Sequence, residues 1–375
     1  MCGICGLLNF ETGAPADPGT IERMTGTIVH RGPDDVGIHL DGPLAMGFRR
    51  LAIIDLSPAG HQPMSDQQGT VWVTFNGEIY NFMEVRRELE AHGHVFLSQC
   101  DTEVIVHGYK QWGEAVLDRL NGMFGLAIWD RKNRRLVLAR DPMGIKPLYY
   151  SVQDGTLYYG SEIRAVRAAL PAQPSPDVEA MALFLRYRYT PAPRTMYAGI
   201  RKLAAGEKLI VRDGCVEVRR HYQFEPIPFA PQPSVKEAAE KLLELYKEAV
   251  RRQLMSDVPL GLLLSGGMDS GLLLGLMNTN GRSWPTFTVG YGGSFSDDEL
   301  DDAADTARIF GAQHHAIRIN QGTFEDNLPR IVGALEEPVA SSSIVPMYFV
   351  CQRAREVVKV ALIGQGPDEL FGGYT

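Results

Sequence analysis

A proline-rich stretch divides this chain into two parts whose sequence rhythms differ. Four prolines fall within residues 224–233. Because proline fixes φ and has no N–H to donate, such a stretch favours an extended, semi-rigid linker. The chain has 375 residues, and a domain commonly holds roughly 100–200. We therefore predict two domains, residues 1–222 and 235–375, joined by a linker at residues 223–234.

The part before the linker is rich in short apolar runs of the kind that form strands. Two of them are separated by a polar turn at residues 130–134, which is typical of a hairpin. Helical periodicity is confined to shorter stretches. This mixture predicts an α+β domain in which sheets pack face to face with helices outside. The expected strands are residues 71–75, 124–129 and 135–139, and the expected helices are residues 84–92 and 102–112.

The part after the linker alternates between helical and strand-like segments. Alternation of this kind predicts a parallel sheet connected by crossover helices, an α/β domain. The expected helices are residues 234–255, 269–278, 298–310 and 323–334, and the expected strands are residues 259–264, 284–290, 314–319 and 357–363.

Composition excludes several classes of protein. The net charge of -8 and the pI of about 5.6 argue against a nucleic-acid partner. Five cysteines are an odd and sparse set, so we expect a reducing, cytoplasmic setting and no disulfide framework. The N-terminus has no secretory signal, and no apolar run approaches the roughly 20 residues of a membrane span.

Cys2 is the first residue whose position points to chemistry. Removal of Met1 would leave a thiol and a free α-amine on one residue, and an α-amine has a pKa near 8. Nucleophile and base would then come from the same residue, as in N-terminal nucleophile enzymes. A cysteine at position 2 is otherwise a chance occurrence. Cys2 and Cys5 form a CxxC pair, but no second pair or histidine cluster completes a zinc site.

Polar clusters downstream change the interpretation of Cys2. Each cluster alone indicates a turn or a helix cap. In this order, however, they resemble the class-II glutamine amidotransferase domain, and the resemblance covers about residues 1–220. It implies an N-terminal nucleophile fold of two packed antiparallel sheets flanked by helices. The clusters are His30–Asp34, Arg49–Asp55, Asn76–Asn81, Cys100–Glu103 and Arg140–Tyr150.

The resemblance implies a role for each of these residues. Cys2 would attack the side-chain amide of glutamine, release ammonia and leave a thioester that water hydrolyses. Asn76 and Gly77 would supply oxyanion donors, and we expect Gly77 on a strained loop. The α-carboxylate and α-ammonium of glutamine would be bound by Arg50 and by Glu78 and Asp101, respectively. Backbone walls would come from Leu51, Ala52, Ile53 and Ile54.

A second constellation follows the apolar run Leu260–Leu264. Ser265–Ser270 reads SGGMDS and precedes a helix, so its N–H groups and hydroxyls form a cradle for phosphate. It is not a Walker P-loop, and the alternative is an ordinary loop capped by Ser265 or Asp269. The segment resembles the pyrophosphate loop of ATP pyrophosphatases. That resemblance implies an ATP site formed by Leu263, Ser265, Gly266, Gly267, Asp269, Ser270, Val289, Ile363 and Gly364.

The last motif, Gly364–Tyr374, resembles a segment of the glutamine-hydrolysing asparagine synthetases. Asp269 and Asp368 would be Mg²⁺ ligands, since Mg²⁺ prefers one or two carboxylates plus phosphate oxygens; the alternative is that Asp368 and Glu369 cap a helix. Gln365 stands where many members carry a glutamate proposed as a base, and an amide cannot be that base. Pro367 is also unusual there. Because family members continue well past this motif, we expect the chain to be a fragment.

Together these observations predict a glutamine-dependent asparagine synthetase. Ammonia made at Cys2 would pass through an internal channel to a second domain that uses Mg-ATP to adenylate aspartate. A related amidotransferase acting on another carboxylate, in cell-wall or secondary metabolism, is one alternative. A non-catalytic module that binds nucleotide or glutamine is another. The expected partners are glutamine, ATP and aspartate or a related carboxylate, with no membrane partner and a possible second copy of the chain in a homodimer.

Overall fold

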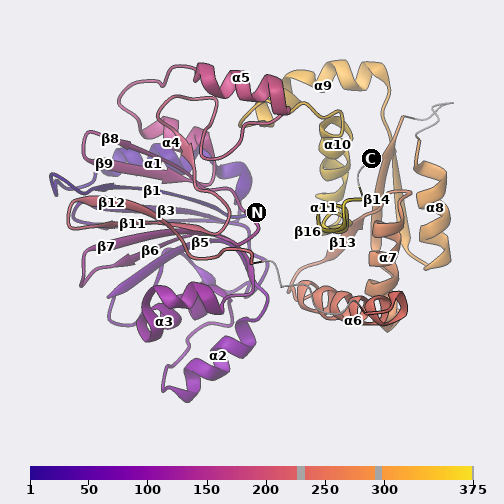
Figure 1. The fold of residues 1–375 in the computed structure, drawn as a ribbon, viewed down its shortest axis with the longest axis horizontal. Helices are drawn as coiled ribbons and strands as arrows, with labels where there is room; N and C mark the ends of the chain where they lie inside the picture. The colour runs from indigo at the N-terminus through magenta and orange to yellow at the C-terminus, as the bar shows by residue number, and fades with distance from the viewer. Residues whose placement is uncertain (226–232, 292–297, 374–375) are drawn as a thin grey trace. The chain divides into compact units, whose positions relative to one another are not determined.

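The computed structural model describes residues 1–225, 233–291 and 298–373 (Figure 1). Its contacts divide the chain into two units. The first unit is Met1–Pro226 with Glu336–Pro338, and the second is Ile227–Leu335 with Val339–Thr375. Most of the predicted linker, residues 226–232, lies outside the described residues.

The first unit is built on two six-stranded antiparallel sheets, so the predicted α+β fold with two sheets is confirmed. One sheet has the order β10 (Arg201–Lys202), β8 (Tyr149–Gln153), β9 (Thr156–Gly160), β1 (Gly3–Asn9), β3 (Leu44–Arg50) and β2 (Asp35–Asp41). The other has the order β12 (Cys215–Arg220), β11 (Glu207–Arg212), β7 (Arg135–Arg140), β6 (Gly122–Asp130), β5 (Val71–Ile79) and β4 (Met64–Ser65).

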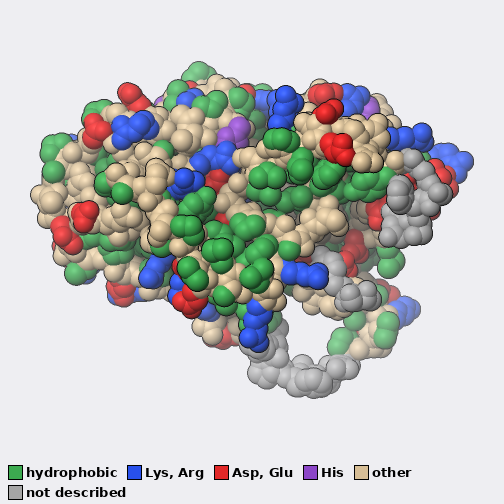
Figure 2. Space-filling view, turned by 90° about the horizontal axis from the view of Figure 1, so that it is seen from above, with side chains coloured by type: hydrophobic (Ala, Val, Ile, Leu, Met, Phe, Trp, Pro, Cys, Tyr) green, Lys and Arg blue, Asp and Glu red, His purple; other side chains and the backbone are tan. Residues whose placement is uncertain are grey.

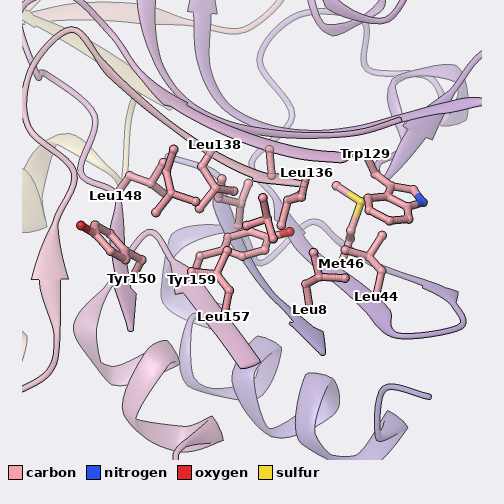
Figure 3. Close-up of a cluster of buried hydrophobic side chains, with 14 of the residues drawn as sticks. Leu8, Leu44, Met46, Trp129, Leu136, Leu138, Leu148, Tyr150, Leu157 and Tyr159 are labelled. Carbon is pink, nitrogen blue, oxygen red and sulfur yellow. The ribbon is translucent and has the colours of Figure 1, made fainter. Parts of the chain in front are cut away.

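The two sheets pack face to face over a shared apolar core (Figure 3). Leu8 and Met46 enter this core from the first sheet, and Trp129 and Leu136 enter it from the second. All four side chains are at least 97% buried. The period-two alternation of a strand places one set of side chains on the inner face, which is why short apolar runs sufficed to predict the strands.

Helices cover the outer faces of these sheets. Ile21 and Met24 of α1 pack with Ala165 of α4 against side chains of β1 and β3. Helix α3 packs against β5 and β4, and α2 packs on α3. The helices of this unit are α1 (Pro18–Thr27), α2 (Phe82–Ala91), α3 (Thr102–Trp112), α4 (Ile163–Ala169) and α5 (Val178–Tyr187).

The second unit contains a four-stranded parallel sheet, as predicted. Its order is β15 (Gln313–Arg318), β14 (Pro285–Gly290), β13 (Leu260–Leu263) and β16 (Val360–Ile363). Its helices are α6 (Val235–Gln253), α7 (Met268–Met277), α8 (Leu300–Ile309), α9 (Gln321–Ala334), α10 (Ile344–Ala354) and α11 (Pro367–Phe371).

Helix α10 is an element that the sequence pattern did not predict. Its sequence is apolar on several sides, and Phe349, Val350 and Ala354 are buried, so no clear polar face marks it as a helix. Its partners in the core include Phe287 of β14 and Val358. By contrast, α6 begins at a capping box in which Ser234 and Glu237 exchange hydrogen bonds, and this start was readable from the sequence.

Side chains of both charges are interspersed over the face of the molecule seen in Figure 2. Among the described residues, no helix is both long and apolar enough to cross a membrane.

Candidate functional sites

A small cavity of about 60 Å³ in the first unit brings together residues from distant parts of the chain. It lies where β1 begins, where β3 and β5 end and where α3 begins. The predicted residues that line it are Cys2, Arg50, Leu51, Ile53, Ile54, Asn76, Gly77, Glu78 and Asp101. Ala52 is not among the lining residues; its N–H instead donates to Asp34 Oδ2 over 2.9 Å.

The Cys2 thiol lies against the backbone of Leu51. Its Sγ is 3.4 Å from Leu51 N and 3.5 Å from Leu51 O. The carbonyl oxygen of Cys2 accepts a hydrogen bond of 2.9 Å from Arg31 Nε, which fixes the backbone of Cys2. Burial raises the pKa of the Cys2 thiol, so the thiol is protonated at neutral pH in this form. A thiol in this state would need a base before it could act as a nucleophile.

The α-amine of Met1 interacts electrostatically with the Cys2 thiol. Burial lowers the pKa of this amine to about 6. Its nitrogen is therefore mostly neutral at pH 7 and able to accept a proton. Loss of Met1 would turn the nitrogen of Cys2 into a free α-amine on the same residue as the thiol.

Asn76 and Gly77 lie side by side near the end of β5. The side-chain Nδ2 of Asn76 is buried and has no hydrogen-bond partner among the described residues. An unpaired buried donor is costly, and Asn76 lines the same cavity as Cys2. It is therefore available to a developing oxyanion.

The prediction of a strained loop at Gly77 is wrong, because Gly77 is part of the regular strand β5 and its φ is not positive. Glycine is required there for another reason. A Cβ at this position would lie 2.0 Å from the carbonyl oxygen of Met123 in the neighbouring strand. The expectation that another backbone segment lies close to Gly77 is thus correct. The reason is the pairing of β5 with the neighbouring strand and not a turn.

Two carboxylates give the cavity an acidic side. Asp101 precedes α3 but does not cap it; its Oδ2 accepts a hydrogen bond of 2.9 Å from Ile79 N. Burial raises the pKa of Asp101 to about 7 and also raises the pKa of Glu78. Both groups therefore favour a cationic partner that would restore their charged form.

Lys146 is a lining residue to which the sequence motifs gave no role. It is 95% buried and belongs to the Arg140–Tyr150 motif. Its Nζ lies 3.1 Å from Met1 Sδ. Burial lowers the pKa of Lys146, while Glu78 opposes that effect. Its presence in a recognised motif was a usable signal, but the motif alone did not show that the side chain faces the thiol.

Arg50 is held in place by two backbone carbonyl groups. Its Nη1 donates to Ser57 O over 2.9 Å, and its Nη2 donates to Asp55 O. Arg50 is nearly completely buried, with 7% of its surface exposed. A guanidinium fixed by two carbonyls can present its remaining N–H groups to a carboxylate in a defined geometry.

The second unit has a larger cavity of about 630 Å³, at the carboxyl ends of β13, β14 and β16. This is where ligands bind in open parallel sheets. The predicted residues that line it are Leu263, Ser265, Gly267, Asp269, Ser270, Val289, Ile363, Gly364 and Asp368. Residues of α10 that were not predicted, Pro346, Met347 and Val350, line it as well.

The loop between β13 and α7 is organised by its own hydroxyls. Ser270 Oγ accepts from Ser265 N over 3.1 Å, and Ser265 Oγ accepts from Gly267 N over 3.1 Å. Gly266 does not line the cavity; its N–H donates to a carboxylate oxygen of Glu299 over 3.1 Å. Helix α7 begins at Met268, and its N-cap residue is Gly267, with no side-chain cap hydrogen bond, so neither Ser265 nor Asp269 is the N-cap residue.

Asp269 and Asp368 both line this cavity, whereas Glu369 has a different role. Glu369 Oε2 accepts a hydrogen bond of 2.8 Å from Gly366 N and so closes the start of α11. In the described part of the chain, no group of three or more His, Cys, Asp or Glu residues is arranged so that it could hold a metal ion. Two carboxylates fit an Mg²⁺ ion that completes its shell with nucleotide phosphates and water.

Comparison with known proteins agrees with this arrangement. Residues 1–223 match the family described as glutamine amidotransferase domain, and residues 241–375 match the family described as asparagine synthase. The chain is 32% identical over 396 residues to a glutamine-hydrolysing asparagine synthetase homologue of Methanocaldococcus jannaschii, a match that covers 100% of this chain and 76% of that protein. The chain belongs to the glutamine-hydrolysing asparagine synthetase family.

Other members of the asparagine synthetase family are considerably longer. Asparagine synthetase 1 of Bacillus subtilis (strain 168) is 37% identical over 381 residues, covering 100% of this chain and 59% of that protein. The chain thus spans about 60% of the length of several curated relatives that it matches. A solved structure of glutamine phosphoribosylpyrophosphate amidotransferase from B. subtilis aligns with a TM-score of 0.45 and 17% identity, covering 87% of this chain and 70% of that chain.

Proposed function

We propose that this chain carries the glutaminase site and the nucleotide site of a glutamine-dependent asparagine synthetase. The observation that best supports the first site is the buried, unpartnered Nδ2 of Asn76 in the cavity that also holds the Cys2 thiol. An unpaired buried donor is costly to the folded state, whereas an acyl-transfer site needs a donor where negative charge develops.

In the proposed glutaminase reaction, glutamine enters the first cavity with its α-carboxylate on Arg50 and its α-ammonium on Glu78 and Asp101. The α-amine of processed Cys2 takes the thiol proton, and the thiolate attacks the side-chain amide carbon. Asn76 Nδ2 and the N–H of Gly77 stabilise the resulting oxyanion. The protonated amine then gives its proton to the leaving nitrogen, and ammonia departs from a thioester that water hydrolyses.

In the proposed synthetase reaction, the second cavity binds ATP at the loop Ser265–Ser270. The carboxylate of aspartate attacks the α-phosphorus, pyrophosphate leaves, and ammonia then displaces AMP to give asparagine. Mg²⁺ held by Asp269 and Asp368 would neutralise phosphate charge. Water exclusion would protect the adenylate from hydrolysis.

The glutaminase assignment is tested by Cys2→Ala in the full-length protein. We expect no glutamine hydrolysis, while synthesis driven by free ammonia is retained, because the second cavity is chemically intact. Ser270→Ala is the reciprocal variant, since it removes a hydroxyl from the nucleotide loop and leaves Cys2 untouched. Glutamine hydrolysis that persists in Cys2→Ala would disprove the nucleophile assignment.

One observation favours a second candidate acceptor. Gln365 lines the nucleotide cavity, where an amide replaces a possible general base. The alternative to aspartate is therefore a different carboxylic acid. Another residue of its binding site would then act as the general base. Full-length protein incubated with ATP, Mg²⁺, ammonia and a panel of carboxylic acids would identify the acceptor. Release of ADP in place of AMP and pyrophosphate would refute adenylation altogether.

We further propose a cytoplasmic enzyme with neither nucleic-acid nor membrane partners. The sparse, unpaired cysteines and the acidic net charge of -8 support this setting. A homodimer is the proposed assembly, which sedimentation of the full-length protein would test. A sedimentation coefficient equal to that of the monomer would contradict it.

A further inference from the structure

The segment between α2 and α3 has a functional residue at its end and no regular structure of its own. Residues 92–101 form neither helix nor strand. Asp101, the last of them, lines the first cavity. Burial disfavours the charged form of Asp101. An ionised Asp101 would therefore be more stable in water, and other contacts must fix the segment to keep it buried. The position of Asp101 therefore depends on what anchors this segment.

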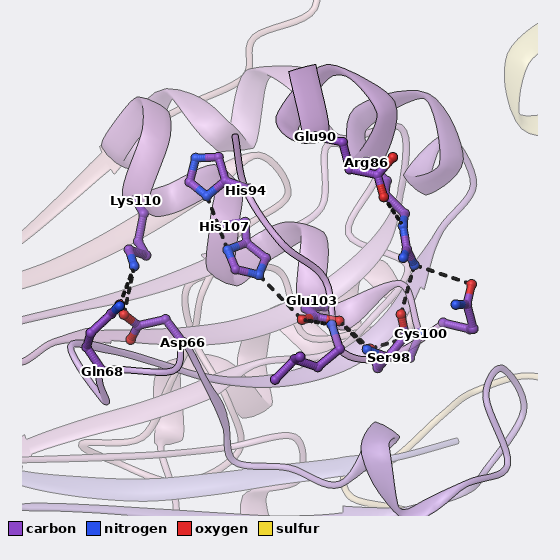
Figure 4. A network of polar contacts seen from close by, with 12 residues as sticks. Asp66, Gln68, Arg86, Glu90, His94, Ser98, Cys100, Glu103, His107 and Lys110 are labelled. Atoms are coloured by element: carbon purple, nitrogen blue, oxygen red, sulfur yellow. Dashed lines mark hydrogen bonds and ion pairs between the residues drawn. The ribbon is translucent and has the colours of Figure 1, made fainter. Parts of the chain in front are cut away.

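The anchor is the carboxylate of Glu103, in the first turn of α3 (Figure 4). Glu103 is 95% buried. Its Oε1 accepts from Leu97 N over 2.8 Å, and its Oε2 accepts from Ser98 N over 2.7 Å and from Ser98 Oγ over 2.6 Å. One carboxylate thus gathers three donors from two adjacent residues and closes the chain on itself around Cys100 and Asp101.

A second layer of contacts holds the same segment. His107 Nε2 lies 3.4 Å from Glu103 Oε1, and its Nδ1 lies 3.2 Å from His94 Nδ1. Arg86 donates to Ser98 O over 2.8 Å. Burial on its own raises the pKa of Glu103, but the hydrogen bonds from His107, Ser98 and Leu97 outweigh it and lower that pKa to about 2. Glu103 is therefore charged throughout the neutral pH range and accepts its hydrogen bonds from this segment as a carboxylate.

The segment is also fixed at its contact with the cavity. Gln99 N donates to Asp55 Oδ2 over 2.8 Å, and Asp101 accepts from Ile79 N in β5. Strand β5 carries Asn76 and Gly77 three and two residues before Ile79, respectively. The carboxylate of Asp101 is thereby placed at a set position relative to the oxyanion donors.

We propose that Glu103 is a positioning residue that holds the carboxylate of Asp101 where it selects amides bearing an α-ammonium group. This inference rests on the proposed glutaminase function. It assigns a use to a residue of the Cys100–Glu103 motif that touches neither substrate nor thiol. Because the segment closes around Asp101, weakening the hydrogen bonds to Glu103 should change the preference for amides with an α-ammonium group. It should change the rate of the chemical step less.

The test compares two substrates that differ only in the α-amino group. These are glutamine and glutaramate, the same primary amide without that group. The quantity measured is the ratio of kcat/KM for the two in the full-length protein. Asp101→Asn should lower the ratio about 10-fold or more, since a charge-assisted contact is lost. Glu103→Gln should lower it in the same direction, with kcat for glutaramate within about twofold of the parent.

A matched control is Glu88→Gln, which neutralises a half-exposed carboxylate of α2 that pairs with Arg119 over 2.7 Å. It should leave the ratio unchanged. Ser98→Ala keeps the buried charge and removes one donor to Glu103. Should Glu103→Gln fail to fold, Ser98→Ala must still lower the ratio by a smaller factor.

The outcomes distinguish the proposed role of Asp101 in glutamine binding from the proposed positioning role of Glu103. If Asp101→Asn leaves the ratio unchanged, the proposed role of Asp101 in glutamine binding is wrong. If Asp101→Asn lowers the ratio but Glu103→Gln and Ser98→Ala do not, the positioning role of Glu103 is overturned. Equal losses for both substrates in the Glu103 and Ser98 variants would also overturn it, because they indicate general damage to the fold.

Discussion

Replacing Asp101 by asparagine should make the empty first unit more stable at neutral pH. Burial raises the pKa of Asp101 from 3.8 to about 7. At 1.36 kcal/mol for each unit of pKa, keeping this carboxylate ionised costs the folded state on the order of 4 kcal/mol. Asparagine is nearly the same size, and its carbonyl oxygen can still accept from Ile79 N. The substitution therefore removes the charge and keeps the hydrogen bond.

The cost of Asp101 has a defined pH range. Above pH 7 the carboxylate is ionised in both the folded and the unfolded state, and the full cost is present. Between pH 7 and 3.8 the folded state binds a proton that the unfolded state does not, so the cost falls and then disappears. Asparagine should thus stabilise the unit by on the order of 4 kcal/mol at pH 8 and on the order of 2 kcal/mol at pH 5.

Urea unfolding followed by tryptophan fluorescence measures this difference. Trp72, Trp112 and Trp129 lie in the first unit, and Trp284 is the only tryptophan of the sequence in the second. A Trp284→Phe background therefore reports on the first unit alone. An advantage for Asp101→Asn that is the same at pH 8 and pH 5, or a loss of stability at pH 8, would refute the reasoning. Glutamine should stabilise the parent but not the variant.

Two further substitutions test the oxyanion site. Asn76→Ala should lower kcat for glutamine hydrolysis by about 10²–10³-fold with little change in the far-ultraviolet circular dichroism; a loss of less than about threefold would contradict its role. Gly77→Ala places a Cβ 2.0 Å from Met123 O, so we expect loss of glutaminase activity and a lower Tm. Gly26→Ala, with no atom within 4 Å of the new Cβ, is the control and should preserve both.

The sequence predicted the fold wherever a local pattern reports directly on burial. Strands β5, β6 and β7 and the alternating elements around β13 and β14 were found within a few residues of their observed bounds, because a half-buried strand or an amphipathic helix exposes its period in the sequence. Helix α10 escaped, since a helix that is apolar on several sides has no such period. Helices α1, α4 and α5 and the strands of the first sheet were not predicted individually either, so the local patterns gave only part of the fold.

The predicted glutaminase residues lie in recognisable motifs, and the structure shows which of them line one cavity. Cys2, Arg50, Asn76 and Asp101 come from four separate segments, yet all line one cavity. The place of Lys146 was not predictable, because its contact with Met1 spans 145 residues of sequence. The conformation of Gly77 was also missed, since an Asn-Gly pair usually marks a turn and only the pairing of β5 with β6 shows otherwise.

The two acids of the Cys100–Glu103 motif show how one short stretch serves both stability and function. Glu103 and Asp101 are both buried, yet the pKa of the first is about 2 and that of the second about 7. The difference lies in what surrounds each carboxylate. Donors of the chain itself satisfy Glu103, whereas Asp101 lies beside a second acid, Glu78, which raises its pKa further. An ammonium group in the cavity would supply the positive charge that favours the ionised form of Asp101. The free-energy cost of burying the ionised carboxylate would then be offset when a ligand with an ammonium group binds.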